Sequence, residues 1–368
     1  MSHRPTRRGL LRAAGLAGAA GLAGCSGRIL GSDGGDPEAS AGSAASGPPT
    51  RETPLYQPWD RETLREATVS GGPGKDGIPS VDDPQFAPAG EVPVADDDVV
   101  FGYAGEEDVK AYPQDVLVWH EITNDTLDGR PVAVSYCPLT GTAMGFDRGD
   151  TTFGVSGKLV NNNLVMYDRA TDSRWPQILA TAVDGPREGD QLREFRLTWT
   201  TWGRWRDAHP DTLVMTEDTG YAKRYGSDPY GNYNPTSGYY GGGRTLFPTL
   251  DEGWTETLDE PKRVVIGART ADRAVAFDKP ALRERGLLET DGGGSDDDGF
   301  LAAYDPGLDT GWVYRRDGAS VTAGEEPGRF VVDGEPYRAG DLPLERVYAF
   351  DAMWHAWGGF YPETAYVA

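Results

Sequence analysis

Sulfur, imidazole and lysine side chains are scarce in this 368-residue sequence, which holds only 2 Cys and 4 His. Of its 35 basic residues only 6 are Lys, against 58 acidic residues and a net charge of −23. No basic patch for nucleic acid is therefore expected. An acidic surface poor in Lys suits very high salt, where the Debye length falls to about 3 Å and self-repulsion is screened. The charge indicates a halophilic habitat and says little about a ligand.

The sequence also lacks an apolar run long enough to cross a membrane. Its best candidate, Gly9–Gly24, is interrupted by Arg12 and is too short for a hydrocarbon core of about 30 Å. An arginine pair at positions 7 and 8 opens this run, and a lipobox ending at Cys25 closes it. Residues 1–25 are therefore predicted to be a twin-arginine export signal with lipidation at Cys25. We expect the lipid to hold the protein at the cell surface, on the outer face of the cytoplasmic membrane.

An internal repeat is predicted from three pairs of similar segments that occur in the same order. The pairs are Val99–Pro113 with Val264–Phe277, Ala133–Pro138 with Leu301–Pro306, and Trp202–Thr212 with Trp354–Thr364. The third pair is the most specific, because both members keep two Trp residues at the same spacing. These Trp residues are predicted to be core anchors. Coincidental use of similar strand and turn residues is the alternative.

Each copy combines short strands, Gly- or Asp-containing turns and a short helical turn. The predicted fold class is therefore mainly β with a few short helices, a β-rich α+β fold. Residues 26–52 are rich in Gly, Ser, Ala, Pro and Asp and cannot bury enough surface to offset chain entropy. The predicted organisation is a signal at 1–25, a flexible spacer and N-terminal extension at 26–96, a first repeat at 97–218, a Gly/Tyr-rich connecting segment at 219–261 and a second repeat at 262–368.

One candidate site comes from a predicted hairpin in the first repeat. If Asp128 and Gly129 form a two-residue turn, His120 and Cys137 face each other on the two strands. Directly opposed residues have Cβ atoms about 4.5–5.5 Å apart, so the imidazole and the thiol are expected to meet. A longer loop would shift this pairing.

The His120/Cys137 pair allows three interpretations. The imidazole can lower the pKa of the thiol, with Cys137 as the nucleophile and His120 as the base of a Cys-dependent enzyme. The two side chains can instead bind a copper or zinc ion. They can also be inert groups of the core. Only the first repeat has the pair, because the second has Asp305 and Arg285 at or near the corresponding places.

Further polar side chains are candidates for ligand binding at the same site. They are Glu121, Asn124 and Asp125 beside the pair, and Tyr225 and Tyr230 in the connecting segment. The tyrosines of this segment lie among Gly, Asn and Pro and could stack on sugar rings or flat ligands. Alternatively, they form a covering flap whose rings fill a groove.

Several motifs are shared with one known family. They are Trp119-His120-Glu121-Ile122, Tyr136-Cys137-Pro138-Leu139, Phe153-Gly154-Val155-Ser156-Gly157, Met166-Tyr167-Asp168-Arg169, Trp175-Pro176-Gln177 and His209-Pro210-Asp211-Thr212. From residue 97 to its end, the chain resembles the family called domain of unknown function 3179, as a haloarchaeal-type lipoprotein with twin-arginine export. Many members read Cys-Pro-Leu-Cys where this chain ends the motif with Thr140, so an intramolecular redox disulfide is impossible here. The resemblance implies no activity, because the family has none assigned.

The sequence therefore predicts a membrane-anchored, extracytoplasmic lipoprotein of unassigned activity. The preferred function is a ligand- or metal-binding module with its site at His120 and Cys137. A Cys-dependent enzyme and a purely structural surface protein are the alternatives. No protein partner is indicated.

The export signal and lipobox can be tested separately. Replacing Arg7 and Arg8 by Lys should leave the precursor in the cytoplasm, because the arginine pair directs the chain to the twin-arginine route. Cys25→Ala should release the exported protein from membranes, because it removes the site of the lipid. Immunoblots of cytoplasmic, membrane and released fractions measure both effects. A Cys25→Ala protein that stays firmly bound to membranes would contradict lipid anchoring.

Overall fold

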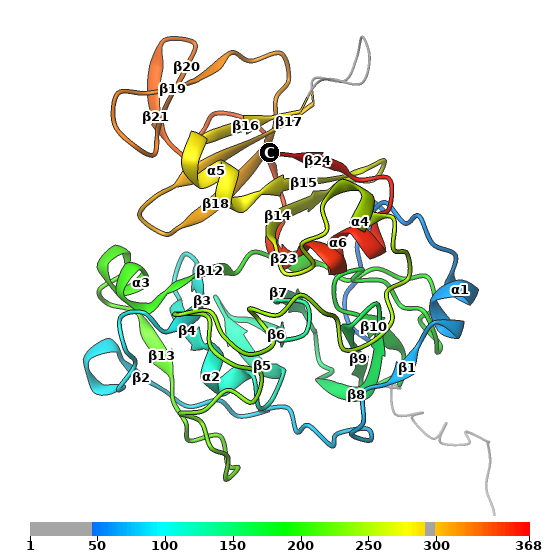
Figure 1. Ribbon diagram of the computed structural model, residues 1–368. Helices are drawn as coiled ribbons and strands as arrows, with labels where there is room; N and C mark the ends of the chain where they lie inside the picture. Colours follow the sequence, from blue (N-terminus) through cyan, green and yellow to red (C-terminus); the bar gives the residue numbers. More distant parts are fainter. Residues whose placement is uncertain (1–45, 291–298) are drawn as a thin grey trace, which may run out of the picture. The chain divides into compact units, whose positions relative to one another are not determined.

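The computed structural model describes residues 46–290 and 299–368 (Figure 1). The predicted export signal and Cys25 lie outside these residues. Within them, short strands form six sheets and the helices are short, so the mainly β class predicted from the sequence is confirmed. The described residues form one compact unit.

Three sheets, each named here after a central strand, contain the first repeat. The β3 sheet has the order β12-β3-β4-β13-β2, the β6 sheet β11-β7-β6-β5 and the β8 sheet β1-β8-β9-β10. Their strands are β1 (Val69–Ser70), β2 (Phe86–Pro88), β3 (Val99–Ala104), β4 (Val109–Pro113), β5 (Ile122–Leu127), β6 (Arg130–Cys137), β7 (Thr142–Asp147), β8 (Phe153–Val160), β9 (Asn163–Asp168), β10 (Arg174–Pro176), β11 (Glu194–Phe195), β12 (Thr198–Thr201) and β13 (Leu213–Met215).

Three further sheets contain the second repeat. The β14 sheet has the order β23-β14-β15-β24, the β17 sheet β16-β17-β18-β22 and the β20 sheet β19-β20-β21. Their strands are β14 (Val264–Arg269), β15 (Ala274–Asp278), β16 (Leu287–Glu289), β17 (Phe300–Asp305), β18 (Thr310–Arg315), β19 (Val321–Ala323), β20 (Arg329–Val332), β21 (Glu335–Arg338), β22 (Arg346–Val347), β23 (Ala349–Met353) and β24 (Ala365–Val367).

The helices of the described residues are short and lie between strands. They are α1 (Arg61–Glu66), the 3-10 helix η1 (Ala89–Glu91), α2 (Gln114–Leu117), α3 (Trp202–Ala208), α4 (Trp254–Thr257), α5 (Lys279–Arg285) and α6 (Trp354–Phe360). Helices α3 and α6 carry the repeated Trp motif, and each leads into the strand that pairs in parallel with the second strand of its repeat.

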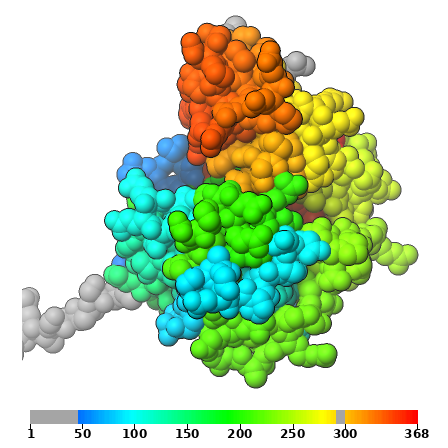
Figure 2. All heavy atoms as spheres, turned by 90° about the vertical axis from the view of Figure 1, so that its left-hand side faces the viewer, coloured from blue at the N-terminus to red at the C-terminus, as the bar shows by residue number. Residues whose placement is uncertain are grey.

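The two repeats have corresponding sheets. The order β12-β3-β4-β13 in one matches β23-β14-β15-β24 in the other, with the same antiparallel and parallel pairings. The order β5-β6-β7-β11 likewise corresponds to β16-β17-β18-β22. Figure 2 shows the orange atoms of the second repeat lying against green atoms of the first, and strands β12 and β18 are in contact. These pairings are what a repeat requires, and the duplication itself stays a prediction that superposition of the two halves would test.

The second Trp of each repeated motif covers a glycine of the first strand of its repeat. The Trp205 ring lies over Gly102 of β3, and the Trp357 ring lies over Gly267 of β14. Each indole N–H donates a hydrogen bond of 3.0 Å to the threonine hydroxyl that ends the motif. Both rings are buried. A Cβ at either glycine would overlap the ring, so the close packing of helix on strand requires Gly.

The predicted hairpin forms with the predicted register. Asp128 and Gly129 have φ values of 48° and 71°, as a two-residue hairpin turn requires. Ile122 then faces Ser135 across β5 and β6. Even-numbered apolar residues of β6 enter one hydrophobic core and odd-numbered ones another, so both faces of this strand are buried.

The ordered chain begins earlier than the sequence predicted. Thr50 pairs with Leu192, and Arg51 forms an ion pair of 3.0 Å with Glu194. A flexible spacer reaching residue 52 is therefore wrong for its last residues, because specific polar contacts hold a stretch whose composition favours disorder. The N-terminal extension that follows packs on the first repeat, where β1 pairs with β8 and β2 with β13.

The Trp-over-Gly packing predicts matched losses of stability. Gly102→Ala and Gly267→Ala should each lower the free energy of unfolding by about 1–3 kcal/mol, because the new methyl group overpacks the Trp ring. Gly90→Ala is the control, since a Cβ there meets only open space. Urea unfolding followed by Trp fluorescence measures all three. A cost at only one of the two packed glycines would argue against equivalent packing in the two halves.

Candidate functional site

Glu121 decides where the His120 side chain lies. Its φ of 58° is in the left-handed region, directly before β5 begins at Ile122. This conformation is uncommon for a residue with a Cβ. The Tyr136 N–H donates to the Glu121 carbonyl at 2.7 Å. The chain therefore turns away from the strand at the point where His120 was expected to continue it.

Both ring nitrogens of His120 are bonded to other groups. Nδ1–H donates to the Pro79 carbonyl at 2.7 Å, so Nε2 accepts from the Tyr225 hydroxyl, also at 2.7 Å. Burial lowers the pKa of His120, which favours this neutral ring. Within residues 46–290 and 299–368, no hydrogen bond joins the imidazole to the Cys137 thiol. The predicted contact is thus replaced by one in which His120 anchors the connecting segment through Tyr225.

Cys137 ends β6 inside a hydrophobic core. The Leu164 N–H donates to Sγ at 3.3 Å, and the thiol donates to the Asn162 carbonyl at 3.7 Å. Burial, together with the nearby Glu121 carboxyl, raises the pKa of the Cys137 thiol to about 11. The thiol is therefore protonated at neutral pH, whereas an activated nucleophile has a lowered pKa.

Thr140 stands where many family members carry a second Cys in the resemblance described above. Its N–H donates to the Cys137 carbonyl at 3.3 Å. Its hydroxyl accepts from the Asn163 amide at 3.1 Å and shares a hydrogen bond of 2.8 Å with Thr142. A satisfied polar network thus fills the place of the second sulfur.

Three ionisable groups lie around this thiol, and with it they are called the Cys137 cluster: Glu121, Lys262 and His355. Their charges affect one another: the charge of Glu121 raises the pKa of Cys137, and that of Cys137 raises the pKa of Lys262. The charge of Lys262 lowers the pKa of His355. Burial raises the pKa of Glu121 to about 8 and lowers the pKa of Lys262 to about 7 and of His355 to about 3. A low-dielectric interior disfavours each charged form, so at pH 7 Glu121, Cys137 and His355 are mainly neutral and Lys262 is about half protonated.

Two atoms of the Cys137 cluster are buried without a hydrogen-bond partner among the described residues, Lys262 Nζ and His355 Nδ1. Lys262 Nζ lies 3.2 Å from the centre of the Tyr239 ring. His355 Nε2–H donates to the Leu139 carbonyl at 3.3 Å, which leaves Nδ1 as an open acceptor. Because buried polar atoms are nearly always paired, an unpaired donor and an unpaired acceptor here mark a place where a ligand could supply the missing bonds.

A pocket of about 540 Å³, called the Lys262 pocket below, opens beside this lysine. Residues of both repeats line it, among them Trp199 and Met353. The other lysine on its wall, Lys279, forms an ion pair with Asp351 at 2.5 Å. Lys262 has no such carboxylate within the described residues. The wall of the pocket therefore has one lysine that is paired with a carboxylate, Lys279, and one without a carboxylate partner among the described residues, Lys262.

The polar residues predicted beside His120 have structural partners. Asn124 bonds the backbone of Phe153 through both ends of its amide, at 2.9 Å each. Asp125 forms an ion pair of 2.9 Å with Lys110. These side chains join the hairpin to strands β8 and β4. Among the described residues, neither is hydrogen-bonded to a member of the Cys137 cluster.

The tyrosines of the connecting segment pack on the first repeat and on one another. Tyr233 and Tyr240 stack with ring centres 3.9 Å apart, and both hydroxyls bond the Tyr136 hydroxyl. Tyr230 packs against Tyr240, and Tyr225 bonds His120. The tyrosine rings therefore pack as a flap over the first repeat, which was the alternative to a surface that stacks on ligands.

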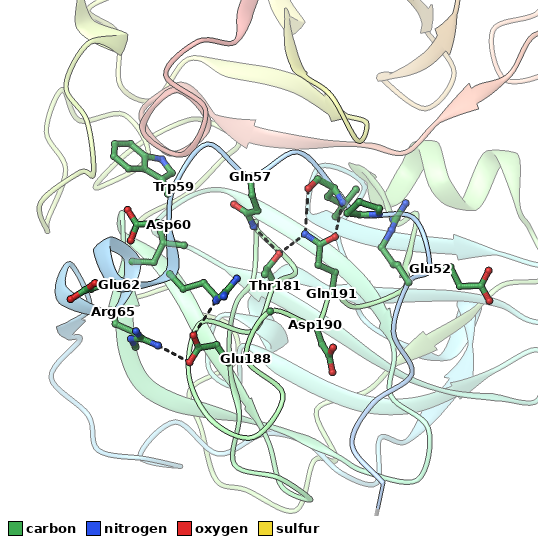
Figure 3. Close-up of a pocket in the computed structure, with 16 residues that line it drawn as sticks. Glu52, Gln57, Trp59, Asp60, Glu62, Arg65, Thr181, Glu188, Asp190 and Gln191 are labelled. Atoms are coloured by element: carbon green, nitrogen blue, oxygen red, sulfur yellow. Dashed lines mark hydrogen bonds and ion pairs between the residues drawn. The ribbon is translucent and has the colours of Figure 1, made fainter.

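Another pocket, of about 750 Å³, lies between the N-terminal extension and residues 181–191 (Figure 3). Its polar side chains bind one another. Gln57 and Gln191 both donate to the Thr181 hydroxyl, at 2.7 and 3.0 Å, and Arg65 forms an ion pair of 2.6 Å with Glu188. The donors of these groups are thus paired, although the buried Gln57 Oε1 has no hydrogen-bond partner among the described residues.

Neither a cluster of potential metal ligands nor a membrane-spanning helix is found in the described part of the chain. Residues 46–290 and 299–368 contain no group of three or more His, Cys, Asp and Glu side chains that could hold a metal ion. No helix among these residues is long and apolar enough to cross a membrane. The copper or zinc site at His120 and Cys137 stays a prediction.

Lys262 and His355 were missed as candidate residues from the sequence. They come from the start of the second repeat and from helix α6, far along the chain from Cys137. The sequence offered one signal for them, namely that Lys and His are rare in this chain, with 6 and 4 residues. Rarity does not reveal which of these residues lie together in the fold.

The described chain is a mainly β protein whose two halves bury one thiol and three ionisable groups beside a pocket. The family described as Protein of unknown function (DUF3179) matches residues 75–364, and the chain belongs to this family. No curated protein and no solved structure matches the chain. Family membership therefore assigns no activity.

The raised pKa of Cys137 predicts slow alkylation. At pH 7, iodoacetamide should modify folded Cys137 more than about 100-fold more slowly than a thiol of pKa 8.5, because only the thiolate reacts. Glu121→Gln should speed the reaction above pH 8, where the wild-type carboxyl is ionised and disfavours the thiolate. Mass spectrometry of quenched samples measures the rates. Glu106→Gln, at an exposed position, is the matched control. Rapid alkylation of the wild type at pH 7 would show that the thiol is activated after all.

Proposed function

We propose that this protein is a ligand-binding module at the outer face of the cytoplasmic membrane, and that its ligand occupies the Lys262 pocket. The observation that carries the proposal is the buried Lys262 Nζ, which lines this pocket without a hydrogen-bond partner. An unpaired buried donor costs free energy. A ligand that offers an acceptor oxygen to Nζ recovers that cost on binding.

The walls of the pocket define the class of ligand. Trp199 and Met353 provide apolar surface, and the Lys279–Asp351 pair keeps its own charges balanced. Lys262 Nζ and the Thr200 hydroxyl oxygen are wall atoms that are buried without a hydrogen-bond partner among the described residues. Behind them, Glu121, Cys137 and His355 are mainly neutral at pH 7. These features suit a small organic molecule with an acceptor oxygen and an apolar face.

The sequence supports the location. The arginine pair at positions 7 and 8 and the lipobox at Cys25 are those of an exported lipoprotein of haloarchaeal type. The acidic composition fits the same salt-rich setting. On this proposal the module faces the outside of the cell while its lipid holds it to the membrane.

The alternatives require rearrangement of the first repeat. A copper or zinc ion at His120 and Cys137 needs an imidazole nitrogen that is now bonded to Pro79 or Tyr225. A Cys-dependent enzyme with Cys137 as nucleophile and His120 as base needs a lowered thiol pKa, whereas burial raises it. A purely structural role for this surface protein would not explain why the amine of Lys262 lies unpaired at a pocket.

The two lysines of the pocket form a matched pair for a test. Acetic anhydride acylates neutral amines, so at pH 7.5 Lys262, with a pKa of about 7, should react about tenfold or more faster than Lys279, whose amine forms an ion pair with Asp351. Isotope-ratio mass spectrometry gives both rates in one sample. Lys262→Met should remove the fast site and leave the protein folded, because Nζ has no hydrogen-bond partner among the described residues and Met keeps an apolar contact with the Tyr239 ring.

Equal acylation of the two lysines would contradict the proposal. It would show that Lys262 is not the accessible, weakly basic amine on which the proposal rests. Metal analysis of protein purified without a chelator decides the metal alternative. One copper or zinc per chain, lost on Cys137→Ser, would replace the proposed organic ligand by a metal ion.

A further inference from the structure

A separate pocket of about 770 Å³ lies where the two repeats meet on another side. Strand β3 and the end of helix α3 contribute residues from the first repeat. Strand β18 and the segments around β20 and β21 contribute residues from the second. It shares no lining residue with the Lys262 pocket.

Arginine dominates the charge of this pocket, which is called the arginine pocket below. Its four arginines are Arg196, Arg329, Arg338 and Arg346, and its two carboxylates are Asp305 and Asp341. The Asp305 carboxylate already accepts from the backbone N–H groups of Gly307 and Leu308. In a chain with a net charge of −23, a pocket with an excess of positive charge is unusual.

Three of these arginines have no carboxylate partner among the described residues. Arg329 alone has one, Glu326 at 4.0 Å, which is the limit of an ion pair. Arg196, Arg338 and Arg346 form no ion pair in the part of the chain that the structure describes. Arginine is the side chain that most often pairs with carboxylates and phosphates, so three without a carboxylate partner at one pocket call for an explanation.

Arg196 is held rigidly by backbone and hydroxyl groups. Its guanidinium donates to the carbonyls of Ala349 and Gly311 at 3.1 and 3.0 Å and to the Thr310 hydroxyl at 2.8 Å. Its Nε–H is buried without an acceptor, and so is the indole N–H of Trp312 on the same pocket. Two fixed donors on this pocket thus lack acceptors.

Two guanidinium groups lie over the same indole ring. Arg196 is 4.1 Å and Arg346 4.6 Å from the centre of the Trp312 ring. Burial lowers the pKa of Arg196; the charge of Asp351 opposes this shift, whereas the positive charge of Arg346 adds to it. Two like charges held against the same ring gain from an anion placed beside them, and more so where water is partly excluded.

We propose that the arginine pocket binds the oxyanion group of a small ligand, a carboxylate or a phosphate. The planar guanidinium groups present paired N–H donors that match two oxygens of such a group. The anion supplies acceptors to the unpaired donors and offsets the repulsion between Arg196 and Arg346. This site is independent of the Lys262 pocket, so either proposal can fail alone.

The test is titration of the whole exported chain with inorganic phosphate and, separately, with acetate, by isothermal calorimetry at constant potassium chloride. Saturable binding of at least one anion is expected. Tighter binding of phosphate would assign a phosphorylated ligand, and tighter binding of acetate a carboxylic one. No saturable binding of either anion would overturn the proposal.

Matched variants separate the pocket from general charge effects. Arg338→Gln with Arg346→Gln should weaken binding of the anion about tenfold or more, because both exposed arginines face the pocket without ion pairs. Arg244→Gln, at an exposed position outside the pocket, should leave binding unchanged. Circular dichroism checks that the variants fold. Equal binding by the double variant and the Arg244 control would also overturn the proposal.

Discussion

Helix α6 of the second repeat packs on the loops of the first, and the Cys137 cluster depends on this contact. The Met353 N–H donates to the Thr140 carbonyl at 2.8 Å, and the Asn161 amide donates to the Ala356 carbonyl at 2.8 Å. These bonds hold the start of the helix over the end of β6. They bring His355 to the loop that follows Cys137 and keep water away from the thiol.

Burial at this contact gives the cluster its chemical character. It shifts the pKa of the acid Glu121 upward and the pKa of the bases Lys262 and His355 downward, so each moves toward its neutral form. The cluster then offers unpaired hydrogen-bonding atoms, and at pH 7 the half-protonated Lys262 carries most of its charge. Such a surface suits recognition of a polar but uncharged ligand group better than nucleophilic attack by Cys137.

The same meeting of the two halves produces a second pocket of opposite character. The guanidinium groups of the arginine pocket keep their positive charge at every physiological pH. The Lys262 pocket, by contrast, has a titratable amine whose charge depends on pH. The two halves therefore form one nearly neutral pocket and one cationic pocket, which would select ligands of different chemistry.

Local features of this protein followed from its sequence. The Asp128-Gly129 turn set the register of the hairpin, because positive φ at two adjacent residues is a property of those residues and their neighbours. The mainly β class and the buried Trp anchors followed from strand and turn composition and from repeated spacing. Membership of the family followed from short motifs around Cys137.

The partners of each side chain were decided only by the tertiary structure. One left-handed residue, Glu121, sends His120 to Tyr225 instead of Cys137, and that residue is held by a bond from the neighbouring strand. Lys262 and His355 reach the thiol from distant parts of the chain. Turn preferences act over a few residues, whereas contacts between repeats depend on how whole sheets and helices pack, which local sequence does not encode.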